Sequence, residues 1–154
     1  MLTKRIWHLL QSREFISLAT CDFDGNPNAA PKFLLKVEGD FIYLVDYTRG
    51  KSWENLKVNP KAALSLMDTE ELTGYRLTGD IEIIDKGKQY EDILHELRQK
   101  EITLSTKRII EGIHSGKTHK EFELEIPDKF IIFKMKVTEV VEIGHRGDVR
   151  RHNV

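Results

Sequence analysis

The feature that most constrains the fold is a series of short runs of alternating apolar and polar residues, separated by turn formers. Residues 15–21 alternate in this way, and residues 22–27 are dense in Asp, Gly, Asn and Pro. Residues 28–37 and 41–45 continue the pattern on either side of Glu38-Gly39-Asp40. Closely spaced strands joined by hairpins predict a mainly β fold, an antiparallel barrel with peripheral helices. Further strands are predicted at 61–67, 75–84, 122–126 and 129–143.

Helical spacing of apolar residues appears in three places. Thr3 is a predicted cap for a helix that ends near residue 14, and a short helix is predicted at 51–58, before Asn59-Pro60. From Gly87 the period changes, which predicts a helical insertion at about 87–115 made of two helices, the second capped by Ser105.

Composition narrows the class of protein. The 154 residues predict one domain covering 1–154, with a basic, mobile tail at 144–154. The 24 basic and 25 acidic side chains leave a net charge of -1, which argues against a nucleic-acid or anionic-membrane partner. The lone Cys21 suits a reducing compartment, and we find neither a signal peptide nor a bilayer-spanning apolar run. We therefore expect a cytoplasmic protein.

The candidate binding site is the turn between the strand at 41–45 and the helix at 51–58. It holds two cations, two hydroxyls and a glycine, and the first amides of a helix lack hydrogen-bond partners and favour negative charge. We expect a phosphate here. A solvated turn is the alternative, whereas a nucleotide P-loop would need glycine where Val45 stands. The residues of the turn are Thr48, Arg49, Gly50, Lys51 and Ser52.

The run Phe-Ile-Ser-Leu-Ala-Thr-Cys-Asp-Phe-Asp-Gly-Asn-Pro-Asn-Ala-Ala-Pro-Lys-Phe at 15–33 resembles the opening of a known family. That family is the pyridoxamine 5'-phosphate oxidase-like, FMN-binding split-barrel family. The match continues at 48–56, at Asn59-Pro60 and at 76–79, and covers roughly the first half of the chain. The resemblance implies a split barrel that forms a homodimer, with FMN at the subunit interface.

The resemblance also implies which residues contact FMN. Lys51 falls on the family's phosphate-binding lysine, with Arg49 and Gly50 beside it. Lys32 or Lys36 would place positive charge near the pyrimidine side of the ring; the alternative for each is a surface lysine, and this alternative is favoured for Lys36. The implied ring contacts are Pro31, Lys32, Phe33, Leu34 and Lys36 on one strand, and Val45 and Asp46 on the next.

The sequence departs from the vitamin-making oxidase itself. Pro31 stands where that enzyme has arginine, and Leu44 where it has an aromatic residue. Residues 144–152 do not reproduce its carboxy-terminal substrate motif. The resemblance therefore implies FMN binding more strongly than it implies oxidation of pyridoxamine phosphate.

We predict a flavin-dependent oxidoreductase that passes electrons between a reductant such as a nicotinamide and a small-molecule substrate. The alternatives are a noncatalytic flavin-binding or redox-sensing module, and a relative that uses F420 or haem. His145 and His152 are the candidate haem ligands. His114 and His119 are separated by Gly116 and lack the helical spacing of a zinc site, so no metal is predicted. No acid, base or nucleophile is assigned from the sequence.

Overall fold

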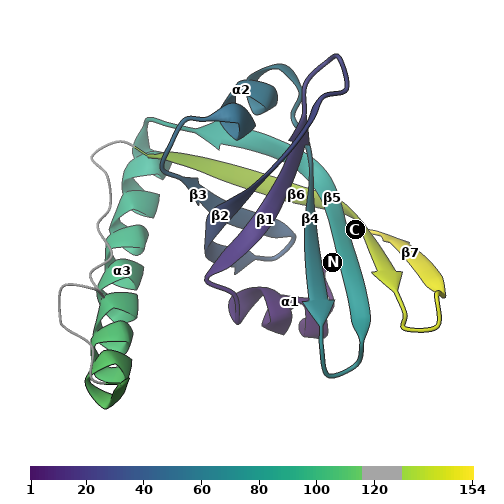
Figure 1. Cartoon of the computed structure of the whole chain (residues 1–154). Helices are drawn as coiled ribbons and strands as arrows, with labels where there is room; N and C mark the ends of the chain where they lie inside the picture. The colour runs from purple at the N-terminus through teal and green to yellow at the C-terminus, as the bar shows by residue number, and fades with distance from the viewer. Residues whose placement is uncertain (116–129) are drawn as a thin grey trace. The chain divides into compact units, whose positions relative to one another are not determined.

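Figure 1 shows the computed structural model of the chain, which describes residues 1–115 and 130–154. The chain divides into two compact units. Met1–Ile84 and Ile131–Val154 make the first unit, and Asp85–Phe130 makes the second. None of the helices in the described ranges is long and apolar enough to cross a membrane.

The described part of the first unit is an antiparallel barrel, as predicted. Its sheet has the order β3-β2-β1-β4-β5-β6-β7, and β3 also pairs with β6, which closes β1 to β6 on themselves (Figure 1). β7 extends the sheet beyond β6. The predicted fold class is therefore confirmed. The strands are β1 (Phe15–Cys21), β2 (Pro27–Glu38), β3 (Phe41–Asp46), β4 (Lys61–Asp68), β5 (Thr73–Ile84), β6 (Ile131–Ile143) and β7 (Val149–Asn153).

The β1–β2 hairpin forms for the local reasons that its sequence indicates. Gly25 has φ 85°, a left-handed conformation that costs glycine little. Asp22 Oδ1 accepts hydrogen bonds from the backbone N–H groups of Asp24 (3.0 Å) and Asn26 (2.9 Å). The side chain of Asp22 thus closes the turn that its backbone begins.

The barrel interior is filled by apolar side chains. Burial alternates along β1, and in β2 it becomes continuous from Lys32 to Leu35, just where the pairing with β3 shifts register between Leu34 and Lys36. Such a bulge turns neighbouring side chains to the same face of a strand. Barrels of this size fill their interior with side chains, so a planar cofactor would have to bind outside the barrel. The fully buried residues of the hydrophobic core include Leu18, Leu34, Ile42, Leu44, Leu64, Leu77 and Phe133.

Gly79 marks the bulge or bend that the sequence predicts within β5. The register of the β5–β6 pairing shifts between Thr78 and Gly79. A Cβ atom at Gly79 would lie 2.0 Å from the backbone oxygen of Lys136, closer than two such atoms can approach. Only glycine permits these two strands to pass at this distance.

Two helices belong to the first unit, α1 (Lys4–Gln11) and α2 (Lys51–Val58). The Thr3 hydroxyl accepts a hydrogen bond from the Ile6 N–H (3.3 Å), which confirms the predicted cap. Ile6 and Leu10 are the buried residues of α1. α2 begins directly after its capping residue Gly50, at the bounds that the sequence predicts.

The described part of the second unit contains one helix, α3 (Lys88–Ser115), where we expected two. Hydroxyls inside the helix bond back to the preceding turn instead of starting a new helix: Thr103 donates to Gln99 O (3.1 Å) and Thr106 to Ile102 O (2.8 Å). The ring of Tyr90 stacks on Phe130, with centroids 5.1 Å apart. The strand predicted at 122–126 lies outside the described residues.

The tail that we expected to be mobile is a hairpin arm instead. The backbone N–H of Gly144 donates to Asp148 O (2.8 Å), and Gly147 turns the chain with φ 82°. β7 then pairs antiparallel with β6, and all of its side chains are exposed. Its charge pattern indicated a solvated segment, but backbone pairing with the edge of β6 orders it.

Candidate functional site

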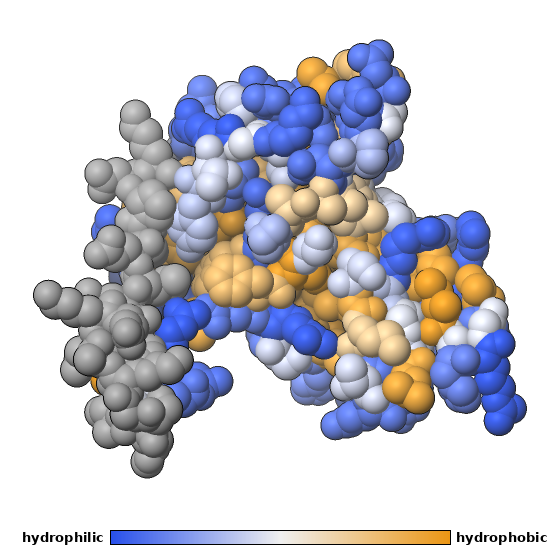
Figure 2. All heavy atoms as spheres, viewed as in Figure 1, coloured by the Kyte–Doolittle hydropathy of each residue, from blue (hydrophilic) through white to orange (hydrophobic). Residues whose placement is uncertain are grey.

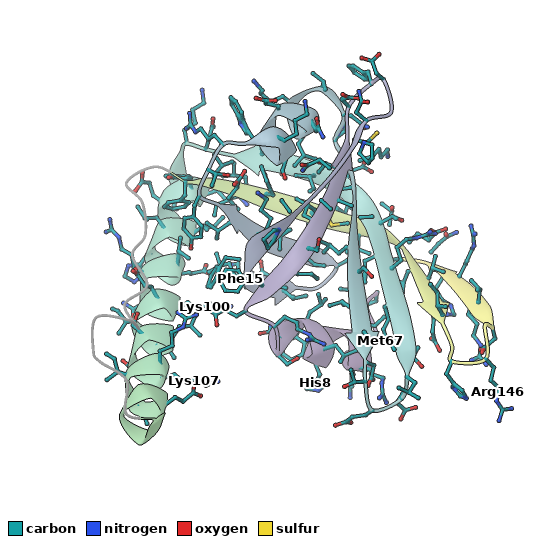
Figure 3. All side chains as sticks on the ribbon, in the orientation of Figure 1. His8, Phe15, Met67, Lys100, Lys107 and Arg146 are labelled. Carbon is teal, nitrogen blue, oxygen red and sulfur yellow. The ribbon has the colours of Figure 1, made fainter. Side chains whose placement is uncertain are left out.

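The candidate site begins with a cavity of about 280 Å³ on the outside of the barrel. It is enclosed by the start of β1, the middle of β2, the end of β3 and the residues that follow β3. Figure 3 shows Phe15 at the start of β1, directed away from the barrel interior. The cavity is lined by Phe15, Ala30, Pro31, Lys32, Phe33, Val45, Asp46, Tyr47 and Thr48.

Strand pairing brings the apolar walls of the cavity together. Phe33 in β2 pairs with Phe15 on one side and with Val45 on the other. The rings of Phe15 and Phe33 meet edge to face, with centroids 5.7 Å apart. Phe15 keeps 48% of its surface exposed, so the cavity has an apolar wall open to a ligand or to another molecule.

The polar end of the cavity is a buried ion pair. Phe33 pairs with Val45, and the strands are antiparallel, so Lys32, which precedes Phe33, lies beside Asp46, which follows Val45. Lys32 Nζ lies 3.0 Å from Asp46 Oδ1, and the two side chains are 7% and 1% exposed. Thr48 donates to the same oxygen from its backbone N–H (3.1 Å) and from its hydroxyl (3.0 Å). Asp46 Oδ2 is buried and accepts no hydrogen bond within the described part of the chain.

The predicted phosphate turn follows the cavity without a break. Arg49 has φ 47°, a left-handed conformation uncommon for residues other than glycine, and its guanidinium carbon lies 5.8 Å from the centre of the Trp53 ring. Gly50 precedes the first turn of α2, and its carbonyl accepts the N–H of Glu54 (3.1 Å). Lys51 Nζ lies 3.6 Å from Glu54 Oε2, and the Lys51 side chain is 54% exposed.

The β1–β2 hairpin contributes a carboxylate to the surroundings of this turn. Hydrogen bonds from the side chain and backbone of Asn26 hold the pKa of Asp22 below its usual range, and the charge of Lys51 lowers it further. Asp22 and Lys51 are therefore close enough for their charges to interact.

A cluster of buried polar side chains fastens α2 to the barrel, and sequence reasoning missed it. Asn28 Nδ2 donates to Ser52 Oγ (3.1 Å), and Asn55 Nδ2 donates to the Thr20 hydroxyl (3.1 Å). Ser52 and Asn55 are nearly inaccessible to solvent. These bonds fix the direction in which the first turn of α2 points. The only sequence signal is that Asn55 falls on the helix face beside Leu56.

Of the twelve predicted contact residues, six line the cavity, and Arg49, Gly50 and Lys51 lie in the turn that adjoins it. The remaining three have other surroundings. Leu34 is fully buried in the barrel core. Lys36 Nζ lies 4.8 Å from the Tyr43 ring centre and 3.8 Å from Glu38 Oε2, away from the cavity lining. Ser52 turns inward to Asn28. Phe15 was missing from the predicted set because the sequence does not show which residue of the neighbouring strand will pair with it.

The candidate haem histidines, His145 and His152, are not among the residues that line this cavity. His145 follows β6 and His152 lies in β7, on the arm that includes Arg146 (Figure 3). His119 and the side chain of His114 lie outside the described residues.

The cavity is not the largest depression on the first unit. An open depression of about 580 Å³ lies over β1, β4, β5 and β6. Small and polar side chains line it, and none of its charged residues is buried. The smaller cavity is the better candidate because it combines a buried ion pair, apolar walls and an adjoining cationic turn.

Comparison with known structures agrees with this architecture. A Clostridium acetobutylicum protein related to general stress protein 26 of B. subtilis, of the pyridoxinephosphate oxidase family, is 19% identical. The match covers 96% of this chain and 90% of that chain, with a TM-score of 0.66. At this identity the likeness shows the fold alone.

Two further structures share the fold. A pyridoxamine 5'-phosphate oxidase-related, FMN binding protein from Nostoc punctiforme is 16% identical, with 100% of this chain and 98% of that chain covered and a TM-score of 0.59. A protein described as F420 Reductase is 18% identical, with 86% and 93% covered and a TM-score of 0.55. No curated protein matches the sequence.

A family comparison extends over nearly the whole chain. The sequence pattern described as pyridoxamine 5'-phosphate oxidase matches residues 2–142, which include β1 to β5, β6 except its last residue, the cavity and the turn before α2. The chain therefore belongs to the pyridoxamine 5'-phosphate oxidase family.

Proposed function

We propose that the protein binds FMN, with the phosphate at the start of α2 and the ring in the cavity between β2 and β3. One observation carries this proposal: Thr48, the last residue along the chain that lines the cavity, is also the first residue of the cationic turn. A ligand that suits this arrangement has a flat ring at one end and an anion at the other. FMN has this form, and one of the proteins of this fold is described as FMN binding.

The residues present fit the two ends of FMN. Arg49 and Lys51 supply positive charge for a phosphate, and the first N–H groups of α2 are suitable donors. Phe15 and Val45 supply apolar surface for a ring, while Lys32 and Asp46 supply a donor and an acceptor at its polar edge. When bound, FMN would supply two-electron chemistry, and the protein would orient it and exclude water.

We also propose that two copies of the chain complete the site. A single copy leaves the cavity small and its aromatic wall half-exposed. Apolar side chains gather on the same face, over β1 and β4 (Figure 2). A second copy that covers this face would bury that surface together with the ring.

The proposed activity is oxidation and reduction of a small molecule, with a nicotinamide as the reductant. A noncatalytic flavin-binding or redox-sensing module is the competing function, because the cavity contains no group that is positioned as an acid, base or nucleophile by any described contact. The deazaflavin F420 is the alternative cofactor, since a protein of this fold is described as F420 Reductase.

Absorbance spectroscopy of the purified protein tests these functions. Bound FMN should give flavin bands, and anaerobic addition of NADH or NADPH should bleach them if the protein is an oxidoreductase. A yellow protein that no nicotinamide bleaches would favour the carrier or sensor. A colourless protein that ignores FMN but binds F420 would replace the proposed cofactor, and one that binds neither would overturn the proposal.

A further inference from the structure

The Lys32–Asp46 pair is unusual because both partners are buried and yet both line a cavity. A buried ion pair is costly to desolvate, and apolar residues of similar volume often stabilise a fold as well. Asp46 Oδ2 adds to this cost, since it is buried without a hydrogen bond in the described part of the chain. These charges are better explained by an interaction with a ligand than by stability.

We propose that Lys32 and Asp46 form a charge-compensated pair that sets how strongly the cavity prefers a reduced, anionic flavin ring over the oxidised, neutral ring. The inference rests on the proposed binding of FMN. Lys32 alone would attract a ring that gains negative charge, as its position in the sequence suggests. In the structure Asp46 lies 3.0 Å from the Lys32 ammonium and cancels most of that attraction.

The argument depends on burial. Charges that are nearly inaccessible to water interact more strongly and are screened less by salt than exposed charges. Lys32 and Asp46 are both in this class. Removing either one should therefore leave the other as an uncompensated charge in the wall of the cavity. The two removals should act in opposite directions on an anion in the cavity.

Asp46 acts in this scheme as a positioning residue. Its Oδ1 accepts hydrogen bonds from the Lys32 ammonium and from two donors of Thr48, which is the first residue of the cationic turn. Asp46→Asn keeps an oxygen for these donors while removing the negative charge. Lys32→Gln removes the positive charge with a side chain that still reaches polar partners.

The test is an anaerobic titration of FMN-loaded protein with dithionite, read as the midpoint potential of the bound FMN. Each ring takes two electrons from dithionite and one proton from water, and dithionite is oxidised to sulfite. The potential reports the ratio of affinities for reduced and oxidised FMN. Asp46→Asn should raise this ratio about tenfold, which corresponds to an upward shift of roughly 30 mV for a two-electron couple.

Lys32→Gln should lower the ratio by a similar factor, and the double variant should return close to wild type. The matched control is Asp68→Asn. Asp68 is also a buried carboxylate, 4% exposed, and it pairs with Arg5 through a 2.6 Å bond to the Nε atom, but it does not line the cavity. Its removal should leave the potential unchanged.

Shifts of the same sign in the two single variants, or no shift in either while FMN stays bound, would overturn the inference and leave FMN binding standing. If Lys32→Gln does not fold, the shift of Asp46→Asn measured against Asp68→Asn decides the question. Failure of the wild-type protein to bind FMN is a separate outcome, which removes the proposed function and this inference together.

Discussion

Lys51 is the residue that most directly tests the phosphate site. It is the first residue of α2, and its exposed ammonium lies 3.6 Å from Glu54 Oε2. An exposed ion pair of this kind is weak, so Lys51 is available to a ligand. A charge-assisted hydrogen bond to a phosphate is worth roughly 1.5 to 3 kcal/mol. Lys51→Ala should therefore weaken FMN binding by about ten- to a hundredfold in a fluorescence titration.

Riboflavin and a second lysine provide the controls for Lys51. Riboflavin lacks the phosphate, so its affinity should change much less. Lys57→Ala removes a lysine from the last turn of the same helix, where the ammonium lies 3.7 Å from the Trp53 ring centre, and FMN affinity should be nearly unchanged. Equal losses of FMN and riboflavin binding in Lys51→Ala would identify the turn as merely solvated.

At the scale of elements, the close approach of β5 and β6 depends on Gly79, which has no side chain. Gly79→Ala would force a Cβ atom against Lys136 O, and the strands would have to move apart at a cost of about 1 to 3 kcal/mol or more. Gly74→Ala in the same strand places its Cβ 3.8 Å from Ile143, an ordinary contact. Urea unfolding should show a large loss for Gly79→Ala only; similar midpoints for both variants would contradict the close approach.

A second element-scale contact joins α1 to the end of β4 through Arg5 and Asp68. Burial acts to raise the pKa of Asp68, but the hydrogen bond from Arg5 and those from the backbone N–H groups of Glu71 and Glu70 outweigh it, so the pKa lies below its usual value. A carboxyl whose pKa is lowered by folding contributes stability above its unfolded-state pKa and loses it as the pH falls.

The stability difference between wild type and Asp68→Asn should therefore be constant at neutral pH and shrink below about pH 4, the usual range of Asp. Urea midpoints measured from neutral to acidic pH check this expectation. A difference that stays constant, or that grows as the pH falls, would show that the Arg5–Asp68 pair does not lower the pKa of this carboxyl in solution.

At the scale of the whole molecule, the open aromatic wall of the cavity leads to the expectation of a homodimer. Phe15 is half-exposed beside a cavity of about 280 Å³, just below the usual range for ligand pockets. Sedimentation velocity at micromolar concentration with FMN present should give twice the chain mass. Phe15→Glu should shift the protein toward monomer and weaken FMN binding at the same time; a monomeric wild type would end this expectation.

Much of the barrel could be predicted because its signals are local. The alternation of residues along β1 and β4, the turn at Asp22 to Pro27, and the start of α2 after Gly50 depend on neighbours in the chain. Local sequence signals gave the wrong prediction where a strand forms only because it pairs with another strand. β7 has only exposed side chains and forms because the edge of β6 offers it hydrogen-bond partners.

For this protein, the sequence by itself determined strands β1 to β6, the hairpin between β1 and β2 and the position of the cationic turn, because turn chemistry and side-chain period act over a few residues. Only the tertiary structure decided that Lys32 meets Asp46, fourteen residues away, and that Phe15 joins the same cavity. These contacts depend on the strand register and on a β-bulge between Leu34 and Lys36. The same alternation of residues would allow several registers, and closure of the barrel selects one of them.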